Sequence, residues 1–195
     1  MRKAERTKQT IIEQAAPLFN QKGIAGTTID DVLQAAKVAK GCLYSHFENK
    51  EDLSAQTADF LLAKITGRIQ EAMSQATSAK GRIFAYLDYC KNPLDTPVVG
   101  GCPIFNLAVE ADDNNPAVKQ KVGAVLAAAQ AGFVAILQEG IDQGEFAPRL
   151  NAEDFAFKMF SAVEGATVIC RVLASSQPMH RLVKTLKDEL ETYSL

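Results

Sequence analysis

The amino-acid sequence predicts an all-α fold with an N-terminal helix-turn-helix domain, residues 1–53, followed by a larger helical domain, residues 54–195. Apolar residues recur at helical spacing along nearly the whole chain, and no segment alternates as a β-strand does. Every proline except Pro17 falls between these helical segments or at the start of one. Helices are therefore the regular elements that we expect.

The composition is that of an ordinary soluble globular protein, with 47% hydrophobic and 23% charged residues. A net charge of −2 excludes a chain coated in basic residues, although a local basic patch would be enough for nucleic-acid binding. The four cysteines are far apart and fit no C-x-x-C spacing, which favours reduced thiols in the cytoplasm over disulfides.

The first predicted helix spans residues 5–22 and should end at Gly23, which stands where the left-handed residue after a helix belongs. Pro17 lies inside it and should remove one backbone hydrogen bond and bend the helix. One broad face is apolar and is formed by Ile11, Ile12, Ala15, Ala16, Leu18 and Phe19.

Residues 28–31 resemble an N-capping box with aspartate in place of glutamate, and they predict the start of a short second helix. Residues 37–39 are too few for anything but a tight turn. Another short helix is expected over residues 40–47, after which Asn49 caps a helix that ends near residue 75. The order is therefore helix, short helix, three-residue turn and short helix.

The remaining predicted helices cover residues 80–91, 103–112, 116–143, 152–174 and 178–193. The most apolar stretch is residues 122–137. Sixteen helical residues span about 24 Å, which is less than the roughly 30 Å of a bilayer core. We therefore expect a buried helix here and no membrane span.

A helix, a short turn and a second helix form the arrangement in which the second helix enters the major groove of DNA. On a helical wheel that starts at Lys40, Leu43 and Phe47 are expected to face inward. The opposite side presents Gly41, Cys42, Ser45 and His46, with Lys40 and Tyr44 at its borders. The alternative is a solvated helical hairpin in a bundle, and spacing alone leaves it open.

The residue types on this side suit contact with DNA. Lys40 can donate to O6 and N7 of guanine, and the small residues beside it allow close approach to base edges. Tyr44, Ser45 and His46 can donate to phosphates, which set the register without reading the sequence. Lys50 adds a cation near the first turn of the next helix, whose backbone N–H groups already favour an anion.

Residues 11–53 resemble the N-terminal signature of the tetracycline-repressor (TetR/AcrR) family of bacterial one-component regulators. The matching pieces are Ala15-Ala16-x-x-Phe19, Gly23, Thr28 with Asp31, Lys40-Gly41, Leu43-Tyr44, His46-Phe47 and Lys50-Glu51-x-Leu53. The resemblance implies a ligand-responsive repressor that binds a palindromic double-stranded DNA operator as a homodimer. The residues that it implies in DNA contact are Thr28, Lys40, Gly41, Tyr44, His46 and Lys50.

Three positions depart from the family pattern. Lys37 stands where the family usually has a turn glycine, so the backbone there must tolerate a side chain or the turn must differ. Ala39 replaces the usual capping serine, which removes a cap worth about 1 kcal/mol. Cys42 occupies a position that often carries threonine or serine, which leaves the base preference there open.

In this family the N-terminal DNA-binding domain is followed by a helical domain that dimerises and encloses a ligand pocket. The resemblance assigns the dimer interface to the last two predicted helices, residues 152–174 and 178–193. The alternative is that their apolar stripes belong to the core of one subunit. These stripes are Phe155, Met159, Ala162, Ala166, Ile169 and Leu173 in the first helix, and Leu182, Leu186, Leu190 and Tyr193 in the second.

The middle helices carry more aromatic and apolar side chains than a compact core obviously needs, beside small residues that leave room. We therefore expect a small, mostly apolar effector in the C-terminal domain, held by a few polar anchors. The alternative is an ordinary core without a cavity. The residues assigned to this site are Phe84, Tyr86, Leu87, Phe105, Asn106, Leu126, Gln130 and Phe133.

Residues 98–116 begin with a Gly-Gly-Cys-Pro loop, in which Cys102 is a candidate sensing thiol at a helix N-terminus. Glu110, Asp112 and Asp113 follow, and the Asn-Asn-Pro after them favours a helix-ending surface turn over a metal site.

The chain offers little for catalysis, since it has two histidines and lacks phosphate-binding and nucleophile-elbow motifs. We expect neither an enzyme nor a cofactor or metal site. The alternative to a DNA-binding regulator is a helical small-molecule-binding or protein-interaction module without specific DNA binding.

Overall fold

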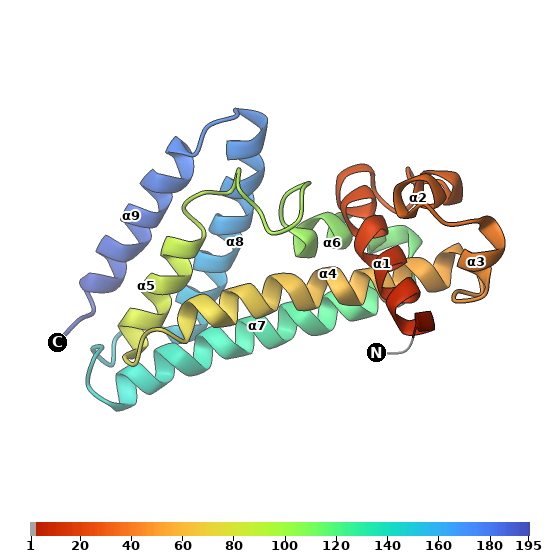
Figure 1. Cartoon of the computed structure of the whole chain (residues 1–195). Helices are drawn as coiled ribbons and strands as arrows, with labels where there is room; N and C mark the ends of the chain where they lie inside the picture. The colour runs from red at the N-terminus through yellow and green to blue at the C-terminus, as the bar shows by residue number, and fades with distance from the viewer. Residues whose placement is uncertain (1–2) are drawn as a thin grey trace. The chain divides into compact units, whose positions relative to one another are not determined.

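The computed structural model describes residues 3–195, and Figure 1 shows that they form a helical protein. Within these residues there are nine helices and one isolated β-bridge, so the all-α prediction is confirmed. The helices are α1 (Lys3–Lys22), α2 (Ile29–Ala36), α3 (Lys40–Tyr44), α4 (Lys50–Met73), α5 (Ala79–Tyr89), α6 (Pro103–Asn114), α7 (Pro116–Asp142), α8 (Ala152–Val172) and α9 (Gln177–Glu191).

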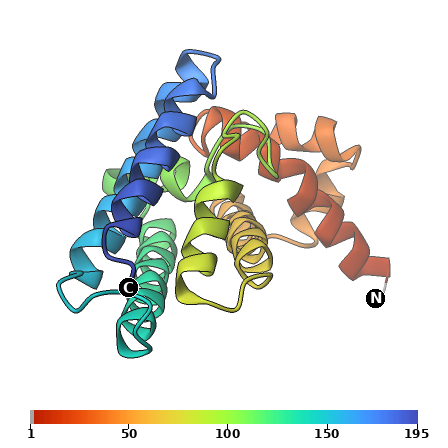
Figure 2. The ribbon, with the colours of Figure 1, turned by 90° about the vertical axis from the view of Figure 1, so that its left-hand side faces the viewer.

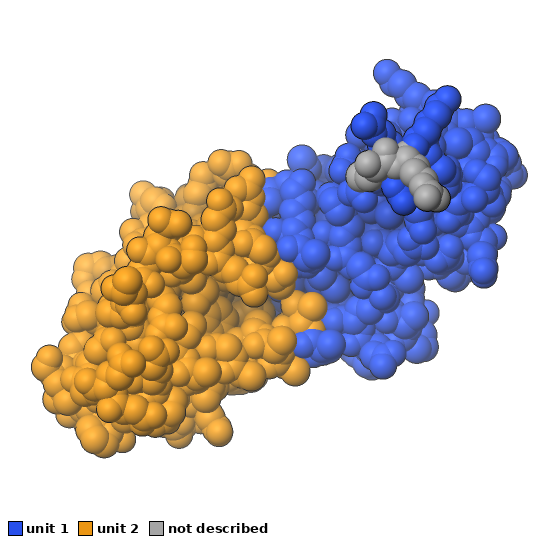
Figure 3. Space-filling view, turned by 60° about the horizontal axis from the view of Figure 1, so that its bottom comes forward, with its two compact units in different colours: residues 1–65, 97–124 blue, residues 66–96, 125–195 orange. Residues whose placement is uncertain are grey.

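The chain divides into two compact units, which Figure 3 distinguishes by colour. Unit 1 comprises residues 1–65 and 97–124, and unit 2 comprises residues 66–96 and 125–195. Unit 1 therefore contains α1, α2, α3 and α6, whereas unit 2 contains α5, α8 and α9. The functional boundary between residues 53 and 54 stays a prediction.

In unit 1, α1 packs against α2 and α3 around one hydrophobic core. The helix continues through Pro17, so the missing N–H does not end it. Apolar side chains from each helix enter the core, and the buried ones are Ile11, Ile12, Ala15, Phe19, Val32, Ala36, Leu43, Phe47 and Leu53.

The predicted capping box at the start of α2 is confirmed. The Asp31 N–H donates to Thr28 Oγ1 at 3.1 Å, and the Thr28 N–H donates to Asp31 Oδ2 at 2.8 Å. This backbone hydrogen bond from Thr28, followed by the one from its hydroxyl, lowers the pKa of the Asp31 carboxyl. At the other end of α2, Lys37 adopts the left-handed conformation with φ 55° and ψ 43°, so the turn keeps its form without glycine. The side chain adds a cost of roughly 1–2 kcal/mol.

The helix α3 is shorter than the predicted segment 40–47, because the chain leaves the helix at Ser45. The Ser45 hydroxyl donates to the Cys42 carbonyl at 2.7 Å, in competition with continued helical hydrogen bonding. Leu43 and Phe47 are nevertheless both buried, as predicted. The predicted cap of α4 is confirmed, since the Asp52 N–H donates to Asn49 Oδ1 at 2.7 Å.

In unit 2, α8 and α9 lie side by side, as Figures 1 and 2 show, and α5 packs against α9. The turn after α7 is tied to the start of α5, because the Glu145 carboxylate accepts hydrogen bonds from the Ala79 and Lys80 N–H groups at 2.9 and 3.1 Å. Gly140 lies so close to Phe146 that a Cβ there would come within 2.5 Å of the ring. Glycine is therefore the residue that this packing admits.

The apolar helix α7 has 27 residues, more than the sixteen-residue segment that we used to argue against a membrane span. That length argument is wrong: among residues 3–195, α7 is the one helix long and apolar enough to cross a membrane by length and composition. The expectation of a buried helix is also wrong, because most residues of α7 are at least partly exposed. Two of its lysines form ion pairs within the chain, Lys121 with Asp59 at 2.7 Å and Lys119 with Asp112 at 2.9 Å.

Candidate DNA-binding surface

Helix α3 presents a polar face around a buried anchor. Leu43 has no exposed surface and Phe47 has 2%, so the two side chains hold the helix against the core of unit 1. The residues that the anchor leaves exposed are Lys40, Gly41, Tyr44 and Ser45, while Cys42 and His46 are half-buried. The orientation predicted for α3 is thus confirmed, and contact of these residues with DNA stays a prediction.

The first turn of α3 is open to another molecule. A Cβ built on Gly41 would meet nothing within 4 Å, so packing inside the chain does not explain this glycine. Lys40 and Gly41 are both exposed there. A lysine beside a residue with no side chain allows the backbone of the helix to approach base edges closely.

Thr28 is exposed near the start of α2, but its hydroxyl already has two roles in the capping box. It accepts from the Asp31 N–H and donates to Asp31 Oδ2 at 2.8 Å. A hydrogen bond from this hydroxyl to a phosphate would therefore replace the one to Asp31. The Thr28 N–H is also used, since it donates to the same carboxylate.

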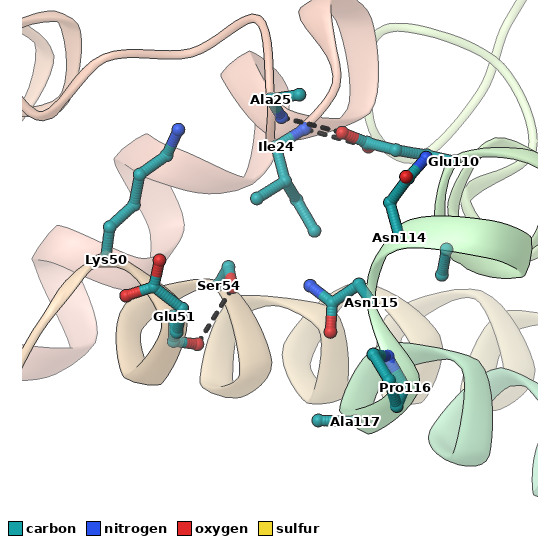
Figure 4. A pocket seen from close by; sticks show the side chains of 11 residues that line it. Ile24, Ala25, Lys50, Glu51, Ser54, Glu110, Asn114, Asn115, Pro116 and Ala117 are labelled. Carbon is teal, nitrogen blue, oxygen red and sulfur yellow. Dashed lines mark hydrogen bonds between the residues drawn. The ribbon is translucent and has the colours of Figure 1, made fainter.

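Lys50 begins α4, where the backbone N–H groups of the first turn favour an anion. Its side chain is half-buried and lines a pocket of about 580 Å³ within unit 1, which Figure 4 shows from close by. A second cation lies near the end of α3, because Lys8 Nζ is 5.5 Å from the centroid of the Phe47 ring. Both lysines supply the positive charge that a phosphate backbone attracts.

The residues predicted to bind an effector are divided between the two units. Phe105 and Asn106 belong to unit 1, and the Asn106 amide donates to Asn20 Oδ1 and to the Asn20 and Gly100 carbonyls. These contacts give Asn106 a structural role. The six residues in unit 2 are Phe84, Tyr86, Leu87, Leu126, Gln130 and Phe133, and their role in effector binding stays a prediction.

Within unit 2, the aromatic residues of this set are part of the core. The rings of Tyr86 and Phe133 lie with centroids 4.6 Å apart, and both side chains are buried. Lys187 Nζ lies 4.7 Å from the centroid of the Phe84 ring. Gln130 is half-buried, and its amide donates to the Glu153 carbonyl at 3.3 Å. The aromatic cluster therefore contributes to folding whether or not an effector binds.

Two cysteines differ in what their surroundings permit. Cys102 is the half-buried N-cap residue of α6, with Pro103 in the first turn as predicted, and its role as a sensing thiol stays a prediction. Desolvation raises the pKa of the Cys90 thiol to about 12, a shift that the nearby Glu164 carboxylate increases. Cys90 therefore remains a thiol at neutral pH and is a poor nucleophile.

The apolar stripe predicted for the last helix lies in the core of a single chain. Leu186 and Leu190 of α9 are buried within unit 2, together with Phe155 and Met159 of α8. The alternative left open for these stripes is therefore correct for these four residues. Three apolar residues of α8 outside the predicted stripe, Phe157, Val168 and Val172, are exposed, which the sequence reasoning missed. Ile169 and, just after the helix, Leu173 belong to the predicted stripe and are also exposed.

Two family models match the chain. Residues 11–57 match the model described as bacterial regulatory proteins of the tetR family, and residues 79–186 match a tetracyclin repressor-like C-terminal domain. Together they cover the helix-turn-helix and most of unit 2.

Solved structures and a relative of known name agree with these models. A TetR transcriptional regulator from Chloroflexus aurantiacus is 33% identical, with a TM-score of 0.95 over 100% of this chain and 98% of that one. A TetR-family regulator from Cytophaga hutchinsonii is 30% identical, with a TM-score of 0.89 over the same shares. The transcriptional repressor DhaR of a Mycobacterium species is 22% identical over 94% of this chain and 91% of its own.

Proposed function

Because the chain belongs to the TetR family of DNA-binding transcriptional regulators, we propose that it is a repressor that binds a palindromic operator as a homodimer and releases it when a small, mostly apolar effector binds. The family is one of regulators rather than enzymes. A cytoplasmic location, where the operator DNA is accessible, is part of the same proposal.

The observation that carries DNA binding is the exposed face of α3. Lys40, Gly41 and Tyr44 stand free of the core that buries Leu43 and Phe47. In a helix-turn-helix the residues at the N-terminal part of the second helix contact base edges. We assign base contact to Lys40, Gly41 and Cys42, and phosphate contact to the polar residues around them, which are Thr28, Tyr44, Ser45, His46 and Lys50.

The exposed face of α8 supports homodimer formation. Phe157, Val168 and Val172 follow one another at intervals that return to the same side of a helix, and Val172 is 80% exposed. A contiguous apolar face of this kind marks an interface. A two-fold dimer uses the same face on both subunits, and its symmetry requires a two-fold symmetric operator.

The distinction between base and phosphate contacts can be tested by two lysine substitutions. We expect Lys50→Ala to weaken binding to all DNA sequences alike and to reduce the slope of log K against log salt by about 2 in magnitude, one phosphate in each subunit. Lys40→Ala should instead relax preference at one base position per half-site by roughly 1–3 kcal/mol. The duplex is obtained by selection from a random-sequence library with the wild-type protein, and binding is titrated at several salt concentrations.

The roles of the two lysines would be reversed if Lys50→Ala changed base preference while Lys40→Ala changed the salt slope alone. Failure of the selection to enrich any sequence with two symmetric half-sites would contradict the operator proposal itself.

The effector site can be tested at its proposed polar anchor. A compound that releases the operator must bind more tightly to the form that does not bind DNA. In a screen of hydrophobic cations, phenols, acyl esters and aldehydes, we expect the releasing compounds to raise the melting temperature of the protein. Gln130→Ala should increase the concentration needed for release by about 2–10-fold, the loss of one hydrogen bond.

The matched control is Gln138→Ala on the same helix, where the exposed amide donates to Asp142 at 2.8 Å. It should leave the concentration needed for release unchanged. Equal responses of the two variants would remove Gln130 from the site.

A further inference from the structure

The end of α1 is attached to α6 and to the loop before it by a group of buried hydrogen bonds within unit 1. Asn20, which is 4% exposed, donates through its amide to the Val99 and Gly101 carbonyls at 3.0 and 3.2 Å. The Asn106 amide of α6 donates to Asn20 Oδ1 at 3.1 Å and to the Asn20 carbonyl at 3.0 Å. The two asparagines therefore join the end of α1 to the loop and to α6, which follow each other in the sequence and lie 79 to 86 positions after Asn20.

The loop can make these contacts because of a glycine. Gly100 has φ +121°, which side chains rarely adopt, and a Cβ on it would lie 2.6 Å from the Asn20 carbonyl oxygen. Its own carbonyl accepts from the Asn106 amide at 3.0 Å. The loop thus lies directly against the backbone of α1, with no side chain between them.

One turn after Asn106, Glu110 makes a second attachment, which Figure 4 shows by dashed lines. Its carboxylate accepts from the Ile24 N–H at 2.8 Å through Oε2 and from the Ala25 N–H at 2.7 Å through Oε1. Both N–H groups belong to the loop between α1 and α2, just after Gly23 ends α1 in the left-handed conformation. A carboxylate that accepts two backbone hydrogen bonds fixes the orientation of the two N–H groups as well as their distance from it.

This loop connects α1 to α2, the helix that precedes α3. Thr28, three residues after Ala25, caps α2, and α2 and α3 share one core with α1. An altered loop would therefore tilt α2 and α3 together relative to α1. Glu110 is half-buried and is not part of α3, so it has no place in the DNA contacts assigned above.

We propose that Glu110 is a positioning residue for DNA binding, supported by Asn20 and Asn106: from α6 it holds the α1–α2 loop so that α2 and α3 keep the orientation that fits the operator. This inference rests on the proposed function. Weaker hydrogen bonds to Glu110 lower the fraction of molecules in which α2 and α3 are oriented to bind DNA. The apparent dissociation constant for DNA rises by the same factor. The number of phosphate contacts stays the same, so the salt dependence should not change.

The test compares Glu110→Gln with Asp113→Asn in the full-length protein. Each substitution removes one negative charge from α6 and keeps the size of the side chain, and Asp113 is exposed. The probe is the duplex that the wild-type protein selects from a random-sequence library. We expect Glu110→Gln to weaken binding to it about tenfold with an unchanged salt slope. Asp113→Asn should bind as the wild type does, or slightly more tightly because a charge that repels DNA is gone.

Hydrogen exchange distinguishes positioning from general loss of stability. In Glu110→Gln the Ile24 and Ala25 amides should exchange faster, while the amides of α1 residues in the core keep wild-type rates. Equal affinities of the two charge variants would overturn the proposal, as would faster exchange throughout unit 1 or unchanged exchange at Ile24 and Ala25. If the wild type selects no duplex, the proposed function itself is wrong, and the positioning role falls with it.

Discussion

Truncation of the buried phenylalanine just after α3, Phe47→Ala, should lower the free energy of unfolding by about 3–5 kcal/mol and abolish operator binding. Phe47 is 2% exposed and packs in the core that α1, α2 and α3 share. Its removal leaves a cavity and also takes away the ring beneath Lys8. Urea denaturation followed by circular dichroism measures the stability, and titration of the selected duplex measures the binding.

Tyr44→Ala is the matched control, because it truncates an aromatic side chain three residues before Phe47, at the end of α3. Tyr44 is 43% exposed, so its loss should change the free energy of unfolding by no more than about 0.5 kcal/mol. DNA binding should nevertheless weaken, since Tyr44 is assigned to a phosphate. Equal losses of stability in the two variants would contradict the assignment of Phe47 to the core and of Tyr44 to the exposed side that contacts DNA.

A charge on the exposed face of α8, Val172→Asp, should convert the proposed homodimer into folded monomers. Val172 is 80% exposed in the single chain, so an aspartate there costs little in the folding of one subunit. In the dimer it would place an unpaired charge in an apolar interface, at about 3–5 kcal/mol, and a two-fold axis repeats the change. The dimer dissociation constant should rise at least roughly a hundredfold. Light scattering at micromolar concentration measures the oligomeric state.

Val109→Asp provides the control, because Val109 is another exposed valine, 67% exposed, in α6 of unit 1. This variant should remain a dimer and should bind the selected duplex in both half-sites. Val172→Asp, as a monomer, should protect a single half-site in footprinting. A dimeric Val172→Asp protein would show that the face of α8 is not the interface.

The sequence predicted the helices well where their ends have local signals. The Thr28–Asp31 capping box, Asn49 before α4 and the glycine after α1 all involve residues within four positions of each other, so spacing alone identifies them. The inward direction of Leu43 and Phe47 follows from the helical period. The end of α3 at Ser45 was missed, because a serine hydroxyl can either point to solvent or bond to a carbonyl three residues back.

The two faces of α8 show a limit of periodicity. The sequence predicted one apolar stripe. Phe155 and Met159 of that stripe lie in the core, whereas Ile169 and Leu173 of the same stripe are exposed. Val168 and Val172, which lie outside the stripe, are exposed as well. All of these residues are apolar. The helical period shows which of them share a face of α8, but it does not show which face packs against other helices. Which side meets the rest of the chain depends on where α9 and α5 pack.

By itself the sequence determined that this protein is helical and which side of α3 is polar, because caps and periodicity act over a few residues. The motifs in residues 11–53 resemble those of the TetR family, and that resemblance identified the helix-turn-helix. Only the tertiary structure decided what Glu110, Asn20 and Asn106 do. Glu110 was read as part of a surface turn, yet it accepts hydrogen bonds from Ile24 and Ala25, more than 80 positions earlier in the chain. A carboxylate and an unpaired N–H carry no mark of their partner in the sequence. Folding brings α6 against the α1–α2 loop, and that proximity makes the contact.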